Sequence, residues 1–200
     1  NIFEPRYKAM INQCLSDEMP FGIVLIREGH EVGKPADPYE VGTLAKIVQV
    51  KHRAEGQMTI IVIGLERFEI QDSMIAEDGY LLGTVAKLST DNTDPLLLTQ
   101  LIADLKKLFL TYLELLPDLE AEQINEIESK LALQPEPLSF QIASILNIGM
   151  PEKQTLLEMA NVSQRLEREI EILSREIDFL NTKSGPNTYK LPWGGEVNLN

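Results

Sequence analysis

The side chains capable of nucleophilic chemistry are few in this chain. It has one cysteine, Cys14, and two histidines, His30 and His52. A cysteine or serine nucleophile needs a base such as histidine within hydrogen-bond reach. Both histidines fall in expected loops, and Cys14 falls on the apolar side of an expected helix, where a buried structural thiol is the usual role. The sequence therefore predicts no catalytic residue.

One stretch superficially resembles a phosphate-binding loop. Residues 29–35 read Gly-His-Glu-Val-Gly-Lys-Pro. A P-loop has four residues between its first glycine and the Gly-Lys pair, followed by Ser or Thr. Here three residues intervene and a proline follows, so we interpret the stretch as an ordinary loop. No Gly-x-Ser-x-Gly nucleophile elbow occurs either.

The sequence shows neither the ligands of a metal site nor the paired carboxylates of an acid/base catalytic site. A single cysteine and two separated histidines cannot form a usual zinc shell. The acidic residues Glu120, Glu122, Glu126 and Glu128 fall on an expected helix, which predicts a solvated face and not an acid/base pair. The sequence therefore predicts no metal and no cofactor.

Composition and charge limit the class of protein. The 200 residues are 44% hydrophobic, enough for one or two globular units. The net charge of −13 argues against a nucleic-acid partner, because such proteins present a basic stripe to the phosphates. No apolar run approaches the roughly 20 residues that span a bilayer, and no secretory signal is visible. With one cysteine, these features favour a cytoplasmic protein.

The composition changes near Asp94. Residues 1–90 carry β-branched runs separated by turn residues, and residues 94–181 carry leucine at helical spacing. We therefore expect an α+β protein with a β-rich N-terminal unit, a C-terminal helical bundle and an irregular tail at residues 182–200.

In the β-rich unit, a short helix is expected from Pro5 to about residue 17, since proline is tolerated in a first turn. A hairpin is expected around Gly56, with glycine supplying a positive φ, and residues 27–39 are expected to form a surface loop. Strands are expected at residues 21–26, 41–50, 57–63, 68–70 and 80–88. Several short strands favour a closed or nearly closed sheet, because open edges invite unwanted pairing.

In the helical unit, we expect Gly149 to close one helix and Asn161 to cap another. Helices are expected at about residues 95–117, 120–131, 138–147, 151–160 and 161–181. The last of these spaces Leu166, Ile170, Leu173, Ile177 and Leu180 alternately by four and three, like a coiled-coil seam. Two interpretations stay open: the helix packs on its own bundle, or it forms a homodimer or binds a partner helix.

The resemblance to a known family rests on four segments. They are Ile-Phe-Glu-Pro-Arg-Tyr at residues 2–7, Phe-Gly-Ile-Val at 21–24, Val-Gly-Thr-Leu-Ala-Lys-Ile at 41–47 and Gly-Leu-Glu-Arg-Phe at 64–68. Together with the helical residues 151–167, they resemble the N-terminal substrate-recognition domain of Lon proteases, over about residues 1–181. The resemblance implies a PUA-like pseudo-barrel followed by a helix bundle, and a role in gripping unfolded or tagged polypeptides.

The resemblance is not complete at the two ends. It implies a pair of strands ahead of the Phe-Glu-Pro-Arg-Tyr motif, so we expect one barrel edge to be incomplete in a sequence that begins at Asn1. It also implies ATPase and protease domains after the helices of a Lon protease, whereas residues 182–200 read as a Gly/Pro-containing tail. The chain therefore resembles a stand-alone Lon-domain protein more than a protease fragment.

Charged and apolar residues near the motifs complete the prediction. Among Glu4, Arg6, Glu66 and Arg67, we expect at least one partly buried pair that holds the first helix against the sheet. The candidate polypeptide contacts, chosen as apolar residues in or beside loops, are Tyr39, Met58, Met74 and Ile75.

Two functions remain open. The first is a non-enzymatic polypeptide-binding module, with an adaptor in proteolysis as one form of that role. The second is a small-ligand sensor or an unrecognised hydrolase that uses a barrel pocket. A polar pocket lined by His52 or Cys14 favours the second, and a shallow apolar groove favours the first.

Overall fold

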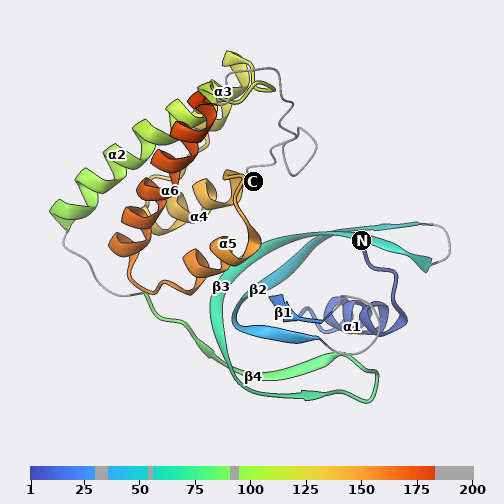
Figure 1. The fold of residues 1–200 in the computed structure, drawn as a ribbon. Helices are drawn as coiled ribbons and strands as arrows, with labels where there is room; N and C mark the ends of the chain where they lie inside the picture. The colour runs from blue at the N-terminus through green and yellow to red at the C-terminus, as the bar shows by residue number, and fades with distance from the viewer. Residues whose placement is uncertain (30–35, 54–55, 91–94, 183–200) are drawn as a thin grey trace. The chain divides into compact units, whose positions relative to one another are not determined.

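A computed structural model describes residues 1–29, 36–53, 56–90 and 95–182 (Figure 1). The chain divides into two compact units, Asn1–Ser89 and Thr90–Asn200. The first holds the strands and the second holds helices, so the predicted α+β class is confirmed. Most of the loop at 29–35, the predicted start at Asp94 and residues 183–200 of the tail lie outside the described residues.

The first unit is an antiparallel sheet with one helix. Its elements are α1 (Pro5–Ser16), β1 (Phe21–Glu28), β2 (Asp37–His52), β3 (Met58–Ile75) and β4 (Leu81–Lys87). The four strands pair in the order β1-β2-β3-β4. Helix α1 begins at Pro5, as expected, because proline fits the first helical position. Gly56, between β2 and β3, has a φ of +64°, which confirms the predicted turn position.

Strand β3 differs from its prediction. Residues 57–63 and 68–70 were expected as two separate strands, but they belong to one strand. The pairing runs from Leu44 with Glu66 directly to Ala45 with Gly64, which leaves Leu65 as an extra residue. Such a bulge bends a strand without ending it. The expected break between residues 63 and 68 is therefore a bulge within one strand.

The expected loop at residues 27–39 is also shorter than predicted. Strand β1 extends to Glu28 and β2 begins at Asp37, so Tyr39 lies within a strand. Ile26 pairs with Pro38 and Glu28 with Asp37 across register shifts. Proline is accepted here because a bulged part of a strand does not need every backbone N–H for pairing.

The sheet curls around α1, as Figure 1 shows for β2, β3 and β4. The Phe68 side chain packs against two glycines on the inside of this curl. A Cβ atom would lie 2.9 Å from Phe68 Cζ if built on Gly22 and 2.7 Å if built on Gly42. Only glycine permits that approach. Among the described residues, β1 pairs only with β2 and β4 only with β3, so the pseudo-barrel is a curled sheet and not a closed hydrogen-bonded ring.

The second unit is built from helices. They are α2 (Pro95–Glu114), α3 (Ala121–Ser129), α4 (Pro135–Ile145), α5 (Met150–Glu158) and α6 (Val162–Thr182). Helix α4 begins at Pro135, earlier than predicted, because a proline in the first turn costs no hydrogen bond. Gly149 does not close α4; it precedes α5 with a φ of −62°. Asn161 caps α6 as predicted, since its Oδ1 accepts the Gln164 N–H at 3.1 Å.

The coiled-coil-like seam of α6 packs within its own unit. Leu166 and Leu173 are buried in the helical core, and Ile170, Ile177 and Leu180 pack against it. This supports the first interpretation of the heptad pattern. A homodimer through α6 remains a prediction, with Phe179 still 40% exposed.

A polar network is buried between α4 and α6. Ser139 Oγ accepts a hydrogen bond from Arg165 Nε at 2.8 Å and donates one to Glu169 Oε1 at 2.7 Å. The Arg165 guanidinium also donates to the Met159 carbonyl and lies over the Phe140 ring. Burial raises the pKa of Glu169 to about 8, against the opposing effects of Ser139 and Arg165. The other oxygen, Oε2, is buried with no hydrogen-bond partner among the described residues.

The first prediction concerns the close approach at Gly42. Gly42→Ala should lower the free energy of unfolding of the first unit by about 2 kcal/mol or more, because the new methyl group would overlap Val24 and Phe68. The matched control is Gly83→Ala, whose Cβ would meet nothing closer than 3.6 Å. Urea denaturation followed by circular dichroism measures both variants. Equal midpoints for the two would contradict the packing described for Phe68.

The second prediction concerns Glu169. Its raised pKa means that the folded chain holds a proton that the unfolded chain releases above about pH 4.5. Stability should therefore fall as pH rises from 5 to 8, by as much as about 4 kcal/mol, since one pKa unit corresponds to about 1.4 kcal/mol. Glu169→Gln should remove most of this slope in urea denaturation, whereas Glu167→Gln, at an exposed position of the same helix, should keep it. Parallel profiles for all three proteins would show that Glu169 is already ionised.

Candidate functional site

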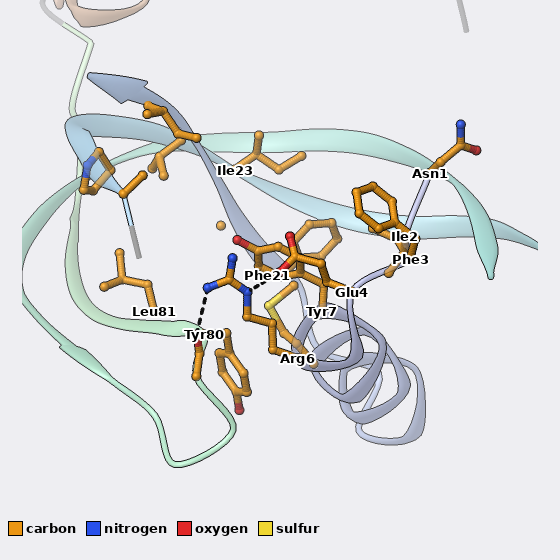
Figure 2. Close-up of a pocket in the computed structure, with 17 residues that line it drawn as sticks. Asn1, Ile2, Phe3, Glu4, Arg6, Tyr7, Phe21, Ile23, Tyr80 and Leu81 are labelled. Carbon is orange, nitrogen blue, oxygen red and sulfur yellow. Dashed lines mark hydrogen bonds and ion pairs between the residues drawn. The ribbon is translucent and has the colours of Figure 1, made fainter. Parts of the chain in front are cut away.

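A groove opens beside β1, between this strand and α1. We call this cavity of about 360 Å³ the β1 groove. It is lined by the start of α1, by β1 and by the chain entering β4 (Figure 2). Four consecutive β1 residues, Phe21 to Val24, line it. The lining also includes Met10 of α1 and Pro38, which pairs with Ile26 across β1 and β2, so the cavity lies between α1 and the sheet.

A second groove opens beside β4. This cavity of about 370 Å³, the β4 groove, is lined by α1 from Met10 to Asp17, by β1 and by β4. Leu44 of β2 and Phe68 and Ile70 of β3 line it as well, so it extends over the sheet and not only along β4. The two grooves share Met10, Phe21, Gly22, Val24, Tyr80 and Leu81.

Large apolar side chains reach solvent in both grooves. Phe3 is 51% exposed and Ile23 is 46% exposed in the β1 groove. Met19, Leu82 and Val85 are likewise exposed in the β4 groove. Clustered exposed apolar groups of this kind mark interaction surfaces in soluble proteins. Both grooves therefore present apolar side chains that a binding partner could cover.

An ion pair positions the helix that forms one wall. Arg6 Nε lies 2.8 Å from Glu4 Oε2, and both side chains are mostly buried. Arg6 Nη1 also donates to the Gly79 carbonyl at 3.2 Å, which ties α1 to the turn before β4 (Figure 2). The expected partly buried pair near the first helix is therefore present. Glu66 instead makes a surface ion pair with Lys87.

The grooves hold little that could perform chemistry. Cys14 lines the β4 groove and is half-buried. Burial raises the pKa of the Cys14 thiol, and the Asp17 carboxylate raises it further, so the unreactive thiol form dominates at neutral pH. His52 lines neither groove. Within the described residues, no group of three or more His, Cys, Asp or Glu could hold a metal ion.

The predicted polypeptide contacts lie outside both grooves. Met74 and Ile75 are 66% and 54% exposed at the end of β3, as a contact residue requires. Tyr39 is half-buried in β2. Met58 is only 3% exposed, so its expected exposure was wrong: Ile2 pairs with Met58 through two backbone hydrogen bonds and the N-terminal segment covers it. Contact of the other three with a polypeptide stays a prediction.

The groove residues were missed because their exposure depends on strand order. Ile23 and Val24 read as an ordinary strand, and nothing in that pattern says whether the strand is central or at an edge. One signal was available. Residues 21–26 carry no charge and no proline, although edge strands usually carry such protection.

The geometry defines a protein with exposed apolar grooves between a curled sheet and a helix. The chain belongs to the family of ATP-dependent protease La (Lon) substrate-binding domains, whose family model matches residues 1–175. It is 30% identical to a Lon protease of Anaeromyxobacter dehalogenans over 86% of this chain and 20% of that protein. Lon protease 2 of Myxococcus xanthus is also 30% identical, over 86% of this chain and 21% of that protein. The chain thus spans about a fifth of these relatives.

Solved structures share the fold. The N-terminal domain of a Mycobacterium avium complex Lon protease superposes with a TM-score of 0.64 at 24% identity, over 87% of this chain and 88% of that one. A Lon N-terminal domain protein from Xanthomonas campestris gives a TM-score of 0.56 at 22% identity, over 86% and 85%. The predicted family and fold are therefore confirmed, whereas the expected stand-alone character stays a prediction. None of the described helices has the length and apolar character needed to cross a bilayer.

A third prediction tests the state of Cys14. The thiol should react with iodoacetamide more slowly than glutathione at pH 8, because its raised pKa keeps it protonated. Raising the pH or adding urea should accelerate the reaction, and Cys14→Ser provides the blank. A native-state rate equal to or above that of glutathione would identify an activated nucleophile and contradict the structural role.

Proposed function

We propose that this chain is a non-enzymatic polypeptide-binding module that recognises unfolded or degradation-prone polypeptides and serves as an adaptor in proteolysis. The observation that carries the proposal is the match of residues 1–175 to a substrate-binding domain family. The matched part of each relative leaves about four-fifths of that protein uncovered. A binding role is therefore what this part of the family has in common.

The two grooves support the proposal physically. An unfolded polypeptide differs from a folded one in that it exposes apolar side chains and unpaired backbone groups. Exposed Ile23 and Phe3 in one groove, and Leu82 and Val85 in the other, can remove such side chains from water. Full burial of one apolar side chain of the polypeptide contributes about 1.5–3 kcal/mol to the binding free energy, before the entropy cost of binding is subtracted.

The alternative of a small-ligand sensor or hydrolase has less support. It was expected to show a polar pocket lined by His52 or Cys14. Cys14 does line the β4 groove, but its neighbours there are mainly apolar and its thiol is not activated. We therefore favour the polypeptide-binding function. We also propose that the protein acts in the cytoplasm and has no nucleic-acid partner.

A fourth prediction tests the function. The purified chain should retain apolar peptides from an array of unfolded-protein sequences, with micromolar affinity and without nucleotide, and should ignore folded proteins. Ile23→Asp should weaken retention about tenfold or more, which corresponds to about 1.4 kcal/mol or more, because a carboxylate would be desolvated in the β1 groove. The matched control is Ile61→Asp, since Ile61 and Ile23 are both 46% exposed but Ile61 lies outside both grooves.

Two outcomes would contradict the proposal. If neither the parent chain nor the Ile61→Asp control retains any peptide, the proposed polypeptide-binding function is wrong. Equal loss in both variants would place the binding surface outside the β1 groove.

A further inference from the structure

The β2–β3 hairpin carries exposed apolar side chains together with positive charge on one face. Ile61 and Ile63 are two residues apart on β3, so their side chains lie on the same face, and both are exposed. Residues directly opposite each other in an antiparallel pair also share a face, which adds Lys46, the partner of Ile63. Val48, at the register shift of β2, is exposed beside them.

The positive charge continues toward the end of this hairpin. Lys51 is exposed and pairs with Thr59, which lies on the same face as Ile61. The exposed Arg53 side chain donates to Thr59 Oγ1 at 2.8 Å, so its guanidinium lies near this face as well. The described residues of the segment 46–65 include no acidic side chain. We call this surface the basic face; it comprises Lys46, Val48, Lys51, Arg53, Ile61 and Ile63.

The β3–β4 hairpin combines exposed apolar side chains with negative charge. Met74 and Leu82 lie directly opposite each other, so their side chains share a face, and both are exposed. Three acidic side chains are exposed near this pair, one on β3 and two in the turn that follows the strand. Residues 68–86 include no lysine or arginine. We call this surface the acidic face; it comprises Asp72, Met74, Glu77, Asp78 and Leu82.

The basic face and the acidic face are complementary to each other. Apolar side chains on each face can cover one another, and the charges around them then meet charges of the opposite sign. Figure 1 shows the ends of the two hairpins well apart within the first unit. The basic face of one chain can therefore meet the acidic face of a second copy but not its own.

A two-fold axis makes this contact twice, because each copy then offers its basic face to the acidic face of the other. A strand rises about 3.3 Å per residue and strands lie about 4.8 Å apart, so about seven paired residues cover a face of roughly 24 Å by 10 Å. Four such faces bury roughly 1,000 Å², which is near the lower limit for a specific interface. The expected dimer is therefore weak and depends on the protein concentration.

We propose that two copies of this chain form a two-fold dimer in which the basic face of each copy binds the acidic face of the other. The inference is independent of the proposed function, which concerns the binding of other polypeptides. It also differs from a dimer through α6, because both faces belong to the first unit.

The fifth prediction reverses the charge of each face in turn. The double variants Lys46→Glu/Lys51→Glu and Asp72→Lys/Glu77→Lys should each raise the dissociation constant of the dimer tenfold or more in sedimentation equilibrium at low salt, because like charges then face each other. The second variant has a smaller net charge, so general repulsion alone would favour its association. An equimolar mixture of the two variants should restore the parent affinity, since both contacts again join opposite charges. High salt should weaken the parent dimer.

The matched control is Lys107→Glu/Lys130→Glu, which changes two exposed lysines of the helical unit. It adds the same net charge as the first variant and should change the dissociation constant less than threefold. Circular dichroism verifies that every variant is folded.

Three results would overturn this dimer. A parent chain that stays monomeric at the highest concentration at which it is soluble has no such interface. If the mixture of the two reversed variants stays monomeric while the parent dimerises, the two faces are not in contact. If Phe179→Asp dissociates the dimer and the charge reversals do not, α6 forms the interface. Peptide retention is measured separately, so failure of the dimer leaves the proposed function standing.

Discussion

The contact of Phe68 with Gly22 and Gly42 is the constraint on which the first unit depends. One aromatic ring on β3 sits where a Cβ on either glycine would overlap it, so three strands curl tightly around one point. A sheet curled in this way turns its inner face toward α1 and leaves β1 and β4 as edges. The two grooves lie between this curled sheet and α1.

Helix α1 turns this curled sheet into a binding surface. A mostly buried ion pair forms at its start, and the Arg6 bond to the Gly79 carbonyl ties that end to the turn before β4. The grooves between it and the strand edges are mainly apolar, and their one thiol is kept protonated. Exposed apolar side chains in these grooves suit the binding of apolar groups. The family of substrate-binding domains to which the chain belongs fits this physical description.

The apolar faces of the helices in the second unit pack against one another. Leu166 and Leu173 of α6 are buried within it, so the heptad spacing serves an internal packing. The Arg165, Ser139 and Glu169 network crosses this core between two helices. Burying such groups costs desolvation energy that their hydrogen bonds only partly return, and the arrangement fixes how α4 and α6 pack on each other. A carboxyl group kept neutral there makes the unit's stability sensitive to pH.

The sequence by itself determined the features that depend on local chemistry. The α+β division, the helix starts at Pro5 and Asn161, the positive φ at Gly56 and the absence of catalytic motifs each follow from residue types at short spacing. The resemblance that identified the family likewise rests on short segments. Only the tertiary structure decided that β3 is continuous, that Met58 is buried and that Ile23 is exposed at an edge. Burial and edge position depend on which distant segments pair and how far the sheet curls, and a strand's own residues do not encode that.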